Sequence, residues 1–179
     1  YLKKIKVSRI YLMANSNLKP DFNDFTIDDN QPEAVILGDI YKDFTWDNLN
    51  KVFKLISNND CILIALHKNK YCKRDGKIAL DLGPFVNSLE YATSKDAVII
   101  GKPEKEFFDL AVNSLNLNKK EIVMVGDDII SDIGGAKKNK IRAIQVKTGK
   151  YQYQDELKKF VQPDIRINSI IDLFNILDN

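Results

Sequence analysis

Cysteine, histidine and long apolar runs are scarce in this sequence. Two cysteines, Cys61 and Cys72, occur among 179 residues, with a single histidine, His67. The cysteines form no Cys-x-x-Cys pair, which argues against a zinc site, and low cysteine usage is typical of a reducing compartment. No stretch is long enough to span a membrane, and the first residues lack the apolar centre of a signal peptide. We therefore expect a cytoplasmic protein.

Excess charge of one sign is also lacking. Lysine and arginine number 27 against 25 aspartates and glutamates, which gives a formal net charge of +2. Such a balance provides no general attraction to nucleic acid or to a membrane surface, so we expect neither as a partner. Because 44% of the residues are hydrophobic, the chain can bury one ordinary core or two small ones.

Apolar runs alternate with amphipathic stretches along the whole chain. This alternation predicts the α/β class, in which parallel strands are connected by helices. The expected strands are 6–14, 34–37, 61–66, 98–100, 122–126, 142–146 and 164–167, and the expected helices are 46–56, 85–92, 103–115, 130–140, 155–160 and 169–177.

Carboxylates gather where one of these strands ends. Asp127 and Asp128 directly follow the buried strand 122–126, and Asp132 comes at the start of the next helix. The carboxyl ends of strands form the edge at which open α/β sheets bind ligands. Carboxylate oxygens are also the ligands that Mg²⁺ prefers. The pattern predicts a magnesium site at this edge.

A lysine follows the strand at 98–100. Gly101-Lys102-Pro103 would bring one ammonium group to the same edge of the sheet as the carboxylates. A lysine beside a metal-binding cluster is typical of a site for an anionic, phosphate-like substrate.

Several motifs together resemble the haloacid dehalogenase (HAD) superfamily of phosphohydrolases, in the subgroup with a large α/β cap of the C2 type. The resemblance extends from about residue 10 to the end and rests on Gly101-Lys102-Pro103, Gly126-Asp127-Asp128, Ser131-Asp132, Gly134-Gly135-Ala136 and Val146-Lys147-Thr148-Gly149. It implies an α/β cap domain at 1–97, followed at 98–179 by the C-terminal part of a Rossmann-like HAD core.

The resemblance also implies a mechanism and roles for residues. In this family an aspartate attacks phosphorus, and water then hydrolyses the aspartyl-phosphate. Asp127 would bind Mg²⁺ directly and Asp128 would bind it through water. Lys102 would neutralise the phosphoryl oxygens, while Asp132 would complete the acidic shell or orient Lys102. A purely structural salt bridge between Lys102 and Asp132 is the alternative.

A basic cluster follows the strand at 61–66. His67, Lys68, Lys70 and Arg74 would lie in the cap, where the resemblance implies contact with a small phosphorylated substrate. The alternative is a partly exposed basic loop with no ligand. Cap-mediated homodimers occur in the family, so we also expect a possible homodimer through the cap.

The nucleophile of the family is absent from this sequence. Family members open with a strand that ends in Asp-x-Asp, and a second strand ends in Ser or Thr. Asp39 also follows an apolar strand, but it lacks the second aspartate and the turn after it. We therefore expect a Mg-dependent phosphohydrolase of which the first third is missing, and which is inactive as the 179-residue chain.

Two other function classes are compatible with parts of the sequence. A catalytically inactive binding or dimerisation module, made of cap and half-core, would account for the absent nucleophile. A phospho-acceptor signalling domain also combines carboxylates, Mg²⁺ and lysine on a doubly wound sheet. In such domains the acidic pair precedes the lysine, whereas Lys102 precedes Asp127 here, which disfavours this class.

Overall fold

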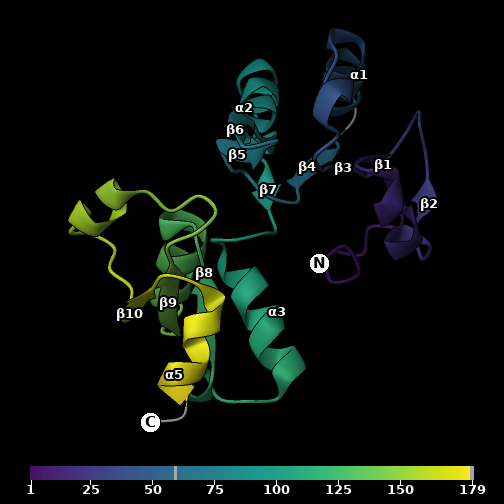
Figure 1. Cartoon of the computed structure of the whole chain (residues 1–179). Helices are drawn as coiled ribbons and strands as arrows, with labels where there is room; N and C mark the ends of the chain where they lie inside the picture. Colours follow the sequence, from purple (N-terminus) through teal and green to yellow (C-terminus); the bar gives the residue numbers. More distant parts are fainter. Residues whose placement is uncertain (59, 178–179) are drawn as a thin grey trace. The chain divides into compact units, whose positions relative to one another are not determined.

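The computed structural model describes residues 1–58 and 60–177, and it divides the chain into two compact units (Figure 1). The first unit is Tyr1–Gly101, and the second begins at Lys102. Both contain parallel strands connected by helices, which confirms the predicted α/β class. Among the described residues, no helix combines the length and the apolar character that crossing a bilayer would require.

The first unit is built on a five-stranded parallel sheet in the order β2-β1-β3-β4-β7. Its strands are β1 (Arg9–Met13), β2 (Thr26–Ile27), β3 (Ala34–Leu37), β4 (Ile62–Ala65) and β7 (Val98–Ile99). We expected the strand at 98–100 to open the second domain. Instead, Ile64 and Ala65 of β4 pair with β7, so the division between the units falls after Gly101 and not after residue 97.

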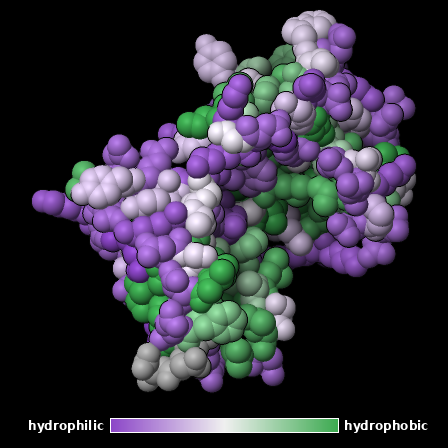
Figure 2. Space-filling model, in the orientation of Figure 1, coloured by the Kyte–Doolittle hydropathy of each residue, from purple (hydrophilic) through white to green (hydrophobic). Residues whose placement is uncertain are grey.

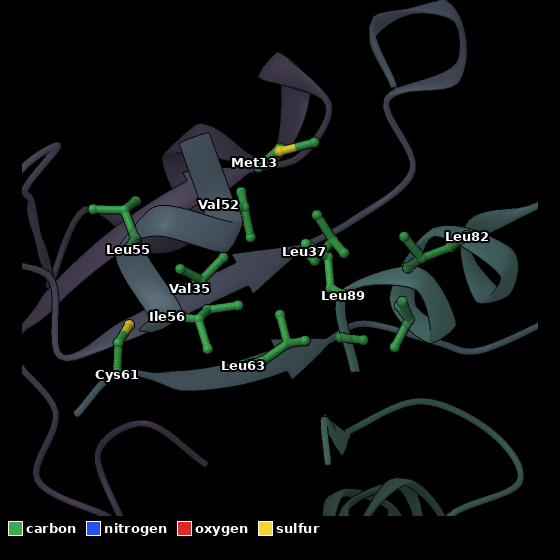
Figure 3. Close-up of a cluster of buried hydrophobic side chains, with 12 residues drawn as sticks. Met13, Val35, Leu37, Val52, Leu55, Ile56, Cys61, Leu63, Leu82 and Leu89 are labelled. Carbon is green, nitrogen blue, oxygen red and sulfur yellow. The ribbon is translucent and has the colours of Figure 1, made fainter. Parts of the chain in front are cut away.

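Helices α1 (Trp46–Asn58) and α2 (Leu82–Thr93) pack against each other and contribute to the main core of this unit. Figure 3 shows Val35, Leu37 and Leu63 of the sheet among Val52 and Leu89 of the two helices, all of them buried. A second cluster joins other strand residues to the N-terminal segment: Leu2, Ile10, Ala34, Ile36 and Ile64, with Phe22 and Phe25 packed against it. Strands covered on both faces have continuous apolar sequences, as β3 does.

An antiparallel hairpin that the sequence patterns did not predict lies between β4 and α2. Its strands are β5 (Tyr71–Arg74) and β6 (Lys77–Leu80). Asp75 and Gly76 both have positive φ, at 49° and 73°, which is the conformation of a tight hairpin turn. The Asp75-Gly76 pair, typical of such turns, thus connects two strands that the sequence analysis did not predict.

The second unit contains a three-stranded parallel sheet in the order β10-β9-β8, with β8 (Val123–Gly126), β9 (Arg142–Val146) and β10 (Ile165–Ile167). Helix α3 (Lys105–Leu115) places Phe108 in a core cluster with Ile129, Ile133 and Ala143. The helix predicted at 130–140 consists of a π-helical segment, Ile129–Gly134, followed by α4 (Gly135–Lys138).

The helices predicted for the last part of the chain are shorter and tighter than expected. A 3₁₀ helix at Tyr153–Leu157 stands in place of the helix 155–160, and a 3₁₀ turn, Ile170–Leu173, precedes α5 (Phe174–Leu177). Exposed apolar side chains remain on this unit, as the green surface in Figure 2 shows; they include Leu110, Leu115, Ile171 and Phe174.

Candidate active site

The acidic turn after β8 closes tightly because a glycine ends the strand. A Cβ built on Gly126 would lie 2.5 Å from the Cβ of Asp132, so a larger residue would push this aspartate away. Asp128 then caps the following helical segment, since its Oδ1 accepts hydrogen bonds from the amides of Ile130 (2.9 Å) and Ser131 (3.0 Å). The three aspartates of the motif are thereby held around a single turn.

Asp132 is the most buried of these three carboxylates, with 6% of its side chain exposed. Its Oδ2 accepts hydrogen bonds from the backbone amides of Asp127 and Asp128, both at 3.1 Å. Its Oδ1 lies 2.7 Å from Nζ of Lys102 in an ion pair. An ion pair able to orient Lys102 is therefore present, but the same pair would also form in a purely structural role, so the role of Asp132 stays a prediction.

Lys102 stands at the start of the second unit, just before α3, with 37% of its side chain exposed. Its Nζ lies 5.8 Å from the ring centroid of Phe107, close enough for a cation–π contact. An ammonium group has three N–H donors, and one of them is enough for the contact with Asp132. Lys102 can therefore keep the ion pair and still donate to an anion.

Lys150 is a second cation at this site, and the sequence analysis did not single it out. Its backbone amide donates a 2.5 Å hydrogen bond to Oδ2 of Asp127, and its Nζ lies 3.3 Å from Oδ2 of Asp128. Gly149, which precedes it, has φ of +57°, and a Cβ there would lie 2.7 Å from Cγ of Asp127. The position of Lys150, shortly after the strand beside β8, is the signal that could have identified it.

Gln145 on β9 supports the same turn from within the core. It is fully buried, and its Nε2 lies 3.5 Å from the carbonyl oxygen of Asp127 and 3.4 Å from Oδ2 of Asp155. Nε of Arg166 donates to its Oε1 at 3.0 Å. Hydrogen bonds therefore reach Asp127 at its amide, its carbonyl and one carboxylate oxygen, which fixes the direction of the other oxygen.

That other oxygen, Oδ1 of Asp127, is the carboxylate oxygen best able to meet a cation. Within the part of the chain that the structure describes, it has no hydrogen bond or ion pair, whereas both oxygens of Asp128 and of Asp132 are engaged. The described residues contain no group of three or more potential ligands that could surround a metal by itself. The turn thus offers one direct ligand, which suits an ion that keeps most of its waters.

The carboxyl group of Asp128 has a lowered pKa. Burial raises this pKa, but hydrogen bonds from the amides of Ser131 and Ile130, together with the ammonium of Lys150, outweigh the effect of burial. Asp128 is consequently ionised at neutral pH, and its negative charge faces Lys150.

The predicted substrate-binding residues lie in the first unit, and three of them face carboxylates of that unit. Nε2 of His67 lies 3.7 Å from Oδ1 of Asp81, which is buried and caps α2. Nζ of Lys68 lies 2.6 Å from Glu90 of the same helix. A substrate anion at these cations would compete with carboxylates that are already in place.

The hairpin contributes the third of these cations. Arg74 on β5 forms a close ion pair with Asp39, and its guanidinium lies 4.4 Å from the ring centroid of Tyr41. The negative charge of Asp39, which the sequence analysis compared with the family's nucleophile, is therefore offset by Arg74. Lys70, the fourth predicted residue, is exposed. Contact of these four residues with a substrate stays a prediction.

Comparison with known proteins bears directly on this site. Residues 99–173, which include the acidic turn, match a family model described as HAD-hydrolase-like. The chain is 36% identical over 163 residues to the phospholysine phosphohistidine inorganic pyrophosphate phosphatase of Danio rerio, covering 90% of this chain and 60% of that protein. It is 42% identical over 153 residues to haloacid dehalogenase-like hydrolase domain-containing protein 2 of Bos taurus, covering 86% of this chain and 58% of that protein.

Solved structures agree in fold. A 4-nitrophenylphosphatase from Thermotoga maritima superposes with a TM-score of 0.88 at 27% identity, covering 97% of this chain and 67% of that one. A p-nitrophenyl phosphatase from Archaeoglobus fulgidus gives a TM-score of 0.87 at 18% identity, with coverages of 98% and 69%. The resemblance inferred from the motifs is confirmed, and the chain spans about 60% of the length of the first of its curated relatives.

Proposed function

Since this chain is a relative of the HAD-like hydrolases, we propose that it carries the lysine and acidic half of a Mg²⁺-dependent phosphohydrolase site. The substrate would be a small phosphate monoester, pyrophosphate or a phosphorylated amino-acid side chain, hydrolysed through an aspartyl-phosphate. The observation that carries the proposal is the 2.7 Å pair of Lys102 and Asp132, on the turn that also holds Asp127 and Asp128.

Lys102 acts on the phosphoryl group in this proposal. Its ammonium donates to phosphoryl oxygens and offsets the negative charge that grows on them in the transition state. Asp132 holds the ammonium in position and is itself fixed by two amide hydrogen bonds. A lysine positioned before the substrate arrives loses less conformational entropy on binding it.

The aspartates fit a magnesium ion. Mg²⁺ is usually held by one or two carboxylates, several waters and substrate phosphate oxygens. Asp127 would contribute Oδ1 as a direct ligand, and Asp128 would be linked through water. When bound, the ion supplies further neutralisation of the phosphoryl charge. The remaining carboxylate, that of Asp132, pairs with Lys102.

The attacking aspartate is the part that these residues do not supply. The sequence contains no Asp-x-Asp, and Asp39 forms an ion pair with Arg74. We therefore propose that turnover needs an aspartate beyond the 179 residues. The alternative is a catalytically inactive binding or dimerisation module, and the same absence supports it.

Two experiments test this proposal, and the second of them separates the enzyme from the module. The 179-residue chain, incubated with Mg²⁺ and p-nitrophenyl phosphate, should release no phosphate; Mg²⁺-dependent release would contradict the need for an external nucleophile. Sequencing the transcript upstream of Tyr1 tests whether the aspartate nucleophile is encoded there. If a strand ending in Asp-x-Asp is encoded there, the longer product should hydrolyse phosphate esters and lose this activity in Lys102→Met. If no such strand is encoded upstream, the inactive binding or dimerisation module is favoured.

The first unit would act as the α/β cap, with His67, Lys68, Lys70 and Arg74 facing the substrate. We also propose a homodimer through this unit. The hairpin supports it, because pairing of Tyr71 with Leu80 places both on one face of β5 and β6, and Leu80 is 64% exposed. Sedimentation analysis would report a monomer if this proposal is wrong.

A further inference from the structure

We propose that Lys150 is a positioning residue that sets the charge of the acidic turn, so that the turn binds one divalent cation loosely and an anion beside it. This inference rests on the proposed function, because it assigns a role at the same metal site.

Lys150 contacts the two aspartates by different parts. Its backbone amide holds Oδ2 of Asp127, and its ammonium faces Oδ2 of Asp128 at 3.3 Å. The two side chains of this ion pair, Lys150 and Asp128, are only 19% and 21% exposed. Charges so poorly exposed are screened less by water and salt than surface charges are.

The backbone, and not the ammonium, keeps Lys150 in place. Gly149 takes a positive φ that brings the next amide to Asp127, and the amide of Tyr151 closes the turn onto the carbonyl of Thr148 at 3.0 Å. Replacing the lysine side chain should therefore leave the hydrogen bond to Asp127 intact. A substitution at this position can isolate the effect of the charge.

The charge count gives the expected consequence. Three carboxylates, Asp127, Asp128 and Asp132, face two ammonium groups, Lys102 and Lys150, so the site carries one net negative charge. A divalent cation would reverse this sign and leave one net positive charge, which attracts a phosphate anion. Without the ammonium group of Lys150, the empty site would carry two net negative charges, and the metal-bound site would carry no net charge.

The two affinities should therefore change in opposite directions in Lys150→Met. We expect Mn²⁺, titrated into the 179-residue chain and followed by the loss of the free-ion electron paramagnetic resonance signal, to bind about fivefold tighter than to the wild type. Inorganic phosphate, titrated calorimetrically into the Mn²⁺-loaded chain, should bind about fivefold more weakly.

Two further variants serve as controls. Lys150→Arg keeps the charge and should match the wild type in both titrations. Lys147→Met removes a lysine of the same turn whose Nζ pairs with Glu156 at 2.8 Å, away from the aspartates, and should also change neither affinity. Circular dichroism confirms that each variant is folded.

The possible results distinguish this inference from the proposed function. Tighter Mn²⁺ binding with weaker phosphate binding supports the inference. Loss of both affinities would mean that the Lys150 side chain supports the structure of the turn, and unchanged affinities would mean that its charge has no effect on binding. Either result overturns the inference but leaves the proposed metal site in place. If none of the chains binds Mn²⁺, the metal site of the proposed function is wrong and the inference is overturned with it.

Discussion

Removing the carboxylate of Asp132 tests whether this side chain holds the acidic turn together. The carboxylate is almost fully buried, accepts two backbone amides and pairs with Lys102. Asp132→Ala would leave both amides without their acceptor. Hydrogen bonds to charged groups contribute about 1.5–3 kcal/mol each, and the ion pair adds less because the lysine is more than a third exposed.

We expect Asp132→Ala to lower the free energy of unfolding by about 3 kcal/mol, after allowing for water that enters the opened turn. Equilibrium unfolding in urea, followed by far-ultraviolet circular dichroism, measures this change. Lys102→Met removes only the ion pair and should cost less than about 1 kcal/mol. Asp109→Ala provides a control, because this partly exposed carboxylate pairs, among the described residues, only with the side chains of Lys105 and Lys119.

The comparison between the variants shows which interaction of Asp132 stabilises the turn. If Asp132→Ala is no more destabilising than Asp109→Ala, the buried carboxylate does not organise the turn. If Lys102→Met costs as much as Asp132→Ala, the ion pair and not the pair of amide hydrogen bonds provides the stability. In the second case Lys102 would be primarily structural, which was the alternative that the sequence left open.

Two further predictions concern the same turn. Gly149→Ala should destabilise the chain by about 2 kcal/mol, because it combines positive-φ strain with a collision against Asp127. Gly76→Ala, with positive φ in open space, should cost only about 1 kcal/mol in the same urea assay. Equal costs for the two variants would contradict the collision. Asp128 has a lowered pKa in the folded chain, so its contribution to stability is complete above the ordinary value of 3.8 and is lost as pH falls through the lower, folded pKa. Urea midpoints between about pH 2 and 6 should accordingly fall less steeply with acid in Asp128→Asn, and parallel curves would refute this.

Local patterns were sufficient to locate the buried strands. β3 lies at Ala34–Leu37, as expected, and β8 and β9 differ from the expected ranges by no more than one residue. β3 and β9 have neighbouring strands on both sides, and β8, although it lies at the end of its sheet, is equally apolar, so continuous apolar sequence identifies all three. The hairpin β5–β6 was missed because its strands, Tyr71–Arg74 and Lys77–Leu80, have only four residues each and show neither a long apolar run nor a regular apolar–polar alternation.

Non-local pairing accounts for most of the remaining errors. β7 has only two residues, and its place in the first sheet depends on β4, which lies more than thirty residues earlier in the chain. The carboxylate partners of the basic cluster were also invisible to local patterns. Asp39 meets Arg74 across 35 positions of sequence, and Glu90 meets Lys68 across 22.

The acidic turn and its lysine illustrate what sequence order can establish about a site. The structure brings together Lys102, Asp127, Asp128 and Asp132, which were expected at the carboxyl ends of strands. The position of Lys150 shortly after the strand at 142–146 was the available signal, but its contacts with Asp127 and Asp128 require β9 to lie beside β8, which sequence order alone did not establish.

The position of β8 at the end of its three-stranded sheet has a practical consequence for bench work. Among the described residues of the second unit, β8 pairs with β9 on one side only, and Val123 at its start is 36% exposed. An apolar strand with one open hydrogen-bonding side can recruit another molecule as protein concentration rises. Titrations and unfolding curves with this chain are therefore best recorded in dilute solution, with light scattering as a check for oligomers held together by this strand.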